Sequence, residues 1–145
     1  MQFYIIHNDP KINASLLPDY ALKKVNLREG WQILSDIGHK FNVTWEGQYA
    51  KYNPYHVLTK SFWMNKEAFD KFIFHYTYCL KEYRNRYDKE TIWHKLFKFF
   101  GKDNYCILYD KISNGDIISQ NLEYLLTEKR KFLTEDEMER LKKFI

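Results

Sequence analysis

The residue best suited to chemistry in this sequence is Glu29, which lies within an expected long helix. Leu22, Val25 and Ile33 follow the i, i+3, i+4 spacing of a buried helix face. Glu29 falls on the same stripe, with Gln32 beside it. A carboxylate on a buried face costs much free energy in desolvation unless it is paired. Glu29 is therefore paired, protonated or in front of a cleft, and a structural salt bridge is the alternative to a functional site.

Two further candidates are a charged pair and an isolated histidine. Glu82 and Arg86 are four residues apart on an expected helix, where they form a structural pair or hold the arginine for a phosphate. His56 lies in an aromatic loop, where it contacts a ligand or caps a nearby helix. Glycine-rich phosphate loops, nucleophile signatures and metal-ligand spacings are absent from the sequence, so we predict neither a metal site nor a cofactor.

Composition limits the class of protein. The 145 residues are 45% hydrophobic and 19% aromatic, which predicts a single globular domain, and the net charge of +4 mildly favours anionic partners. Cys79 and Cys106 form no CxxC pair, so we expect reduced thiols. No run approaches the ~20 apolar residues of a membrane span. These features predict a cytoplasmic protein without a membrane partner.

The elements that position these residues are predicted to be mainly α-helical. Residues 3–6 are expected to form a short strand or extended arm, and Asp9-Pro10 begins a short helix that Pro18 ends. The remaining predictions are helices over 19–38, 57–64, 66–87 and 90–100, a loop over 40–55, a strand or buried helical turn over 105–109, a turn at Asn114-Gly115, and a final helix opened by the capping box Thr134-Glu135-Asp136-Glu137. We predict a single compact domain over 1–145, in which 101–145 is a helical extension packed on 1–100.

Four short motifs resemble a family of small phage proteins grouped with the phage pyrimidine-dimer DNA glycosylases. The family carries a DP motif, an E-x-x-Q-L-L-S helix, an N-H-P turn and an E-Y-x-x-R-Y helix. The matching segments here are Asp9-Pro10, Arg28-Glu29-Gly30-Trp31-Gln32-Ile33-Leu34-Ser35, Tyr55-His56 and Glu82-Tyr83-Arg84-Asn85-Arg86-Tyr87. The resemblance covers about residues 1–100.

The resemblance implies a covalent mechanism. In such glycosylases the α-amino group of the chain attacks C1′ of the damaged nucleotide, and a glutamate assists the reaction and the β-elimination that follows. By this resemblance Glu29 and the amine of Met1 are the catalytic candidates, because the large residue Gln2 is expected to leave Met1 in place. The candidates for substrate binding are Arg28, Gln32, His56, Glu82 and Arg86.

Three functions remain open at this point. The first is a DNA glycosylase-like protein, a hydrolase or lyase, that recognises a damaged or modified nucleotide and stacks it on Trp31, Tyr52 or their aromatic neighbours. The second is a non-catalytic pocket for a free nucleotide or a nucleotide-derived immune signal, which would make the chain a phage counter-defence sponge. The third is a structural α-domain. The first two predict DNA or a nucleotide as the partner, in the host cytoplasm.

Overall fold

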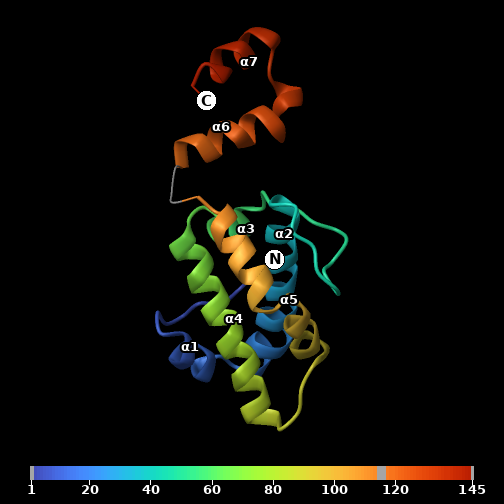
Figure 1. Cartoon of the computed structure of the whole chain (residues 1–145). Helices are drawn as coiled ribbons and strands as arrows, with labels where there is room; N and C mark the ends of the chain where they lie inside the picture. The colour runs from blue at the N-terminus through green and yellow to red at the C-terminus, as the bar shows by residue number, and fades with distance from the viewer. Residues whose placement is uncertain (1, 114–116, 145) are drawn as a thin grey trace.

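The helical segments over residues 21–40 and 66–87 run antiparallel and form the centre of the molecule (Figure 1). The computed structural model describes residues 2–113 and 117–144, and only the backbone of residues 117–120. The elements are α1 (Pro10–Leu16), η1 (Ala21–Asn26), α2 (Leu27–Lys40), α3 (Val57–Ser61), α4 (Lys66–Tyr87), α5 (Ile92–Lys111), α6 (Ile117–Thr127), η2 (Arg130–Phe132) and α7 (Glu135–Lys142). No strand forms in the described residues, so the prediction of a mainly α fold is confirmed.

The predicted helix over 19–38 is a π-helical stretch, η1, that continues directly into α2. Asn26 has helical φ and ψ at the junction, so the chain does not turn there. Hydrogen bonds in a π-helix span five residues, so each residue rotates less about the axis than in an α-helix. In a continuous α-helix, Leu22 and Glu29 would lie on the same face. The π-helical turns between them rotate the two side chains away from each other around the helix axis. This change of phase moves Glu29 toward the edge of the buried face.

The first residues form an extended arm without a strand partner. The Asn26 side chain accepts a hydrogen bond from the Tyr4 N–H at 2.8 Å and donates one to the Tyr4 carbonyl at 3.0 Å. Asn13 accepts from the N–H groups of Ile6 and His7 at 2.6 and 3.0 Å. Both asparagines are fully buried. Two side-chain amides thus satisfy the backbone groups that a neighbouring strand would otherwise pair, so the strand alternative for residues 3–6 is wrong.

Local capping chemistry places most helix ends where the sequence predicts them. The Asp9 side chain accepts from the Ile12 N–H at 3.0 Å, and Asn65 accepts from the Ala68 N–H at 2.7 Å. Thr134 and Glu137 form the reciprocal capping box at the start of α7. The helix predicted to end near Gly101 instead bends there at φ 59° and continues to Lys111 as α5, so residues 105–109 are helical.

The C-terminal helices lie beyond one end of the central helices (Figure 1). Lys40 pairs with Glu123 at 2.6 Å, and the rings of Tyr55 and Tyr124 meet at 5.1 Å, so α6 contacts the end of α2 and the loop before α3. No residue of α7 is buried. The turn expected at Asn114-Gly115 lies outside the described residues. None of the helices described has both the length and the apolar character of a membrane-spanning segment.

Candidate functional site

The face of α2 that carries Glu29 is the candidate site. The Glu29 side chain is 25% exposed, and its carboxylate meets the guanidinium of Arg28 at 3.5 Å. Arg28 is itself 56% exposed. An exposed ion pair of this length contributes at most about 1 kcal/mol, so it holds the carboxylate only weakly. Glu29 therefore stands at the edge of the core with an oxygen that can serve a ligand.

The N-terminal arm crosses the same turn of α2. Asn26, Glu29 and Gly30 are spaced i, i+3 and i+4, so they neighbour one another on the helix surface. Asn26 binds the backbone of Tyr4, and a Cβ added to Gly30 would lie 3.0 Å from the Phe3 ring. The beginning of the described chain is thus packed at the level of Glu29. Met1, the second catalytic candidate, lies outside the described residues.

Gln32, one turn further along, joins α2 to the long loop. Its amide nitrogen donates to Asp36 at 2.8 Å and to the carbonyl of Lys51 at 2.9 Å. Both hydrogens of this amide are therefore used within the protein. Gln32 is placed to position the loop, whereas its predicted role was contact with the substrate.

Asp36 is a buried carboxylate that sequence reasoning missed. It is 1% exposed and accepts hydrogen bonds from Gln32, from the Asn53 N–H at 3.3 Å and from the Thr59 hydroxyl at 3.3 Å. Burial raises the pKa of Asp36, which its hydrogen-bond donors partly oppose. Its position four residues after Gln32 was a usable signal, because that spacing puts both side chains on one face. Asp36 fastens the loop and α3 to α2.

The aromatic candidates divide between surface and core. Tyr52 is 58% exposed and stacks on His39 with ring centres 4.2 Å apart. Its outer face is open to a flat ligand. Trp31 is fully buried, and its indole N–H donates to the carbonyl of Gly47 at 3.0 Å. Trp31 thus belongs to the core and presents no face to a nucleotide, because the apolar spacing of α2 turns it toward Trp45.

His56 is the N-cap of α3. Its Nδ1 accepts a hydrogen bond from the Leu58 N–H at 3.2 Å. This contact corresponds to the capping alternative that the sequence left open. His56 is only half-buried.

Glu82 and Arg86 lie away from Glu29. Arg86 pairs with Glu82 at 2.9 Å and with Asp19 at 3.1 Å. Asp19 precedes Glu29 by ten residues, which corresponds to about 15 Å along a helix. Arg86 also donates to the carbonyls of Ala14 and Ser15, at 3.0 and 3.2 Å. The arginine predicted to bind substrate therefore holds the end of α1 against α4.

Comparison with family models, with curated proteins and with solved structures finds no match to this chain. Within the described residues, no cluster of His, Cys, Asp and Glu side chains is arranged to hold a metal ion. The placement of the motif residues consequently carries the functional argument. It leaves Glu29, Arg28 and Tyr52 accessible and assigns packing or positioning contacts to Gln32, Trp31, Glu82 and Arg86.

Proposed function

We propose that this chain is a DNA glycosylase-like protein that recognises a damaged or modified nucleotide on the face of α2 around Glu29. The observation that carries the proposal is the packing of the N-terminal arm against Asn26 and Gly30, on the turn of α2 that carries Glu29. A mechanism that uses an amine at the start of the chain together with a carboxylate requires the two to lie at the same place.

The chemistry follows from that pairing. The nitrogen lone pair of the α-amino group forms a bond to C1′ as the bond to the base breaks, and the base leaves with a proton. The covalent adduct then becomes an imine when the sugar ring opens. Glu29, held only by an exposed ion pair, accepts the proton from C2′ while the C3′–O bond breaks and the 3′ phosphate leaves. An unperturbed α-amino group has a pKa of about 7.7–8.0, so part of it is free base near neutral pH.

Recognition rests on Arg28, beside Glu29, and on an exposed aromatic side chain that stacks on His39 near the other end of α2. Arg28 presents an exposed guanidinium suited to a backbone phosphate. Tyr52, on the loop that Gln32 fastens to α2, presents an exposed ring suited to stacking on a base. The net charge of +4 supports association with a polyanion.

Borohydride trapping tests the proposal. The full chain is incubated with duplex DNA that carries a pyrimidine dimer or an abasic site, reduced, and weighed by mass spectrometry. We expect a covalent adduct with the wild-type chain, and loss of most of it in Glu29→Gln. Glu67→Gln, an exposed change in the first turn of α4, is the matched control and keeps the adduct.

Two results would count against parts of the proposal. Tight binding of the DNA without an adduct would remove the lyase step and leave a non-catalytic recognition protein. Neither binding nor adduct, in a chain with normal helical circular dichroism, would refute the proposal and favour a structural α-domain.

A further inference from the structure

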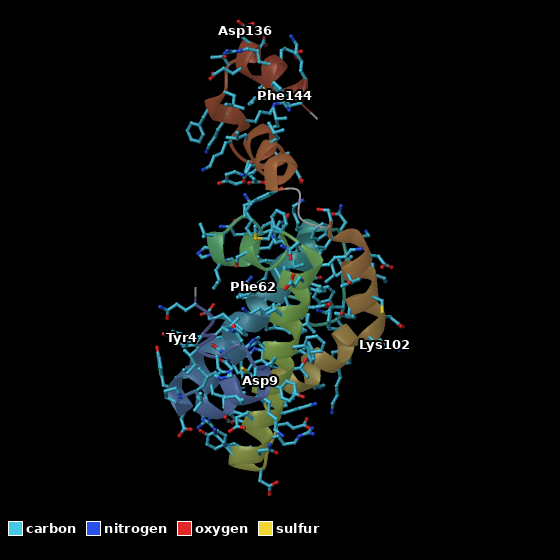
Figure 2. The ribbon with its side chains drawn as sticks, turned by 90° about the vertical axis from the view of Figure 1, so that its left-hand side faces the viewer. Tyr4, Asp9, Phe62, Lys102, Asp136 and Phe144 are labelled. Atoms are coloured by element: carbon cyan, nitrogen blue, oxygen red, sulfur yellow. The ribbon has the colours of Figure 1, made fainter. Side chains whose placement is uncertain are left out.

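A hollow lies against the N-terminal arm. It has a volume of about 670 Å³, within the range of small-molecule sites. Arm residues 5–8 form one wall, Ser61 and Phe62 form another, and Ala68 and Lys71 of α4 complete the lining. Figure 2 labels Tyr4 and Phe62, which mark the arm and the end of α3 beside this hollow. Glu29, Arg28 and Tyr52 do not belong to its lining.

The polar groups of this cavity are mainly donors. Lys71 makes no ion pair with the carboxylates in the described part of the chain. His7 accepts from the Asp9 N–H through Nδ1 at 3.0 Å, so the neutral ring carries its proton on Nε2. No Asp or Glu is among the lining residues, and Asn8 adds an amide. An ammonium group, an imidazole N–H and an amide together favour an anion.

The rest of the wall is apolar. Ile5, Ile6 and Phe62 line the hollow, and the Phe62 ring is stacked on Phe72 with centres 4.9 Å apart. The stack fixes the ring in place, so the apolar side of the cavity is formed before a ligand arrives. A wall that is half donor and half apolar suits a molecule with an anionic group at one end and a flat body at the other.

Behind this wall lies a buried histidine with unmet hydrogen-bonding capacity. His75 is fully buried, and neither of its ring nitrogens makes a hydrogen bond of normal geometry in the described structure. The groups that act on its ring are the Asn8 backbone, Lys71 and Asp9. Asn8 and Lys71 are also lining residues of the cavity, so two groups that act on the His75 ring belong to the cavity wall.

We infer that this cavity binds a small phosphorylated molecule with a flat apolar body, of the nucleoside monophosphate class. The phosphate lies against Lys71 and the Nε2–H of His7, and the base lies along Ile5 and Phe62. The site shares no residue with the Glu29 face, so it stands whether or not the chain acts on DNA.

Isothermal titration calorimetry of the full chain tests this inference with three probes: thymidine monophosphate, thymidine and inorganic phosphate. We expect the monophosphate to bind at least about tenfold more tightly than either fragment, because only it uses both ends of the cavity. If inorganic phosphate bound as tightly as the monophosphate, the proposed contact of the base with Ile5 and Phe62 would be wrong. If the monophosphate gave no heat of binding at millimolar concentration, the whole inference would be wrong.

Variants locate the binding. Lys71→Gln is expected to weaken the binding of the monophosphate about tenfold, because it removes a charge-assisted contact. Ala68→Phe places a ring in the cavity and should abolish binding. Lys81→Gln, on the same helix but outside the cavity, is the control and keeps the affinity. If Ala68→Phe does not fold, Lys71→Gln still decides.

The Glu29→Gln variant separates this inference from the proposed function. It should lose the borohydride adduct and keep the monophosphate affinity. Loss of monophosphate affinity in Glu29→Gln together with normal affinity in Lys71→Gln would place the ligand on the α2 face and refute the inference.

Discussion

Replacement of Arg86 by methionine is expected to destabilise the fold without removing a ligand contact. The guanidinium donates to the carbonyls of Ala14 and Ser15 and pairs with Glu82 and Asp19. Ala14 and Ser15 lie in the last turn of α1. The Ala14 carbonyl accepts a hydrogen bond from the Leu17 N–H at 3.3 Å, and Arg86 adds a second donor to it. Arg86 thus caps α1 from a different helix and places a positive charge at the negative end of its dipole.

The expected loss can be estimated from these contacts. Each hydrogen bond from a charged group contributes about 1.5–3 kcal/mol. The Arg86 side chain is 20% exposed, which weakens both ion pairs, so the two carbonyl contacts carry most of the effect. Both carbonyls are bound by the same guanidinium nitrogen at a partly exposed site, so their effects do not add in full. We expect Arg86→Met to lower the free energy of unfolding by about 2–4 kcal/mol.

Urea denaturation followed by helical circular dichroism measures this loss. The matched control is Arg84→Met on the same helix, where the side chain is 54% exposed and pairs with Glu90. Its expected effect is below about 1 kcal/mol. If Arg86→Met unfolded at the wild-type urea concentration and lost DNA affinity instead, the capping argument would be refuted and Arg86 would again be a ligand residue.

Three further changes test the packing and the titratable core. Gly30→Ala places a Cβ 2.3 Å from the buried ring of Tyr76, so it should lower the melting temperature despite the better helix propensity of alanine, and an unchanged melting temperature would contradict the close approach. Asp36→Asn should be at least as stable as wild type near pH 7, because burial raises the pKa of Asp36 in the folded chain and ionisation of this carboxyl costs stability as pH rises above 3.8. In thermal melts, the difference in melting temperature between the variant and wild type should shrink toward pH 4. Burial lowers the pKa of His75 in the folded chain, so the unfolded chain binds the proton more readily. In thermal melts, wild type should therefore lose stability as pH falls below 6.5, and His75→Phe should lose less.

Helix ends were predictable because their causes are local. Asn65 lies just before an apolar run and caps α4, which spans Lys66–Tyr87 as expected. Asp9 and Thr134 act in the same way on α1 and α7. Each cap involves residues within four positions of each other, so a single sequence contains the whole signal.

The conformation of the arm and the phase of the central helix were not predictable in this way. Residues 3–6 are aromatic and β-branched, which favours a strand. Their backbone groups instead bond to the side chains of Asn13 and Asn26, and nothing in the type of these two residues signals that role. The π-helical stretch Ala21–Asn26 changes the rotation of α2 relative to the residues before it, and the stretch itself contains no glycine or proline from which a change of helix type could be predicted. The wheel that placed Glu29 in the buried stripe therefore contained an error that only three-dimensional packing corrects.

The placement of the motif residues explains why the sequence found Glu29 but assigned too many residues to its site. Asp9 begins α1, and Arg86 caps the end of that same helix, so these two motifs join through α1. Gln32 holds the loop that leads to Tyr55-His56, so the other two motifs join through that loop. These side chains are engaged in the scaffold, and spacing along one helix cannot reveal which neighbouring helix they face.

Glu29 differs from the other motif acids in its partner. Asp9 caps a helix and Glu82 pairs with an arginine that has three other contacts, whereas Glu29 meets one exposed arginine at 3.5 Å. A carboxylate that the fold holds in place but does not neutralise can respond to charge that a ligand brings. Arg28 is the ion-pair partner of that carboxylate, and the N-terminal arm packs on the same turn of the helix through Asn26 and Gly30. For this reason substitution of Glu29 is expected to affect function more than stability, while substitution of Arg86 is expected to do the reverse.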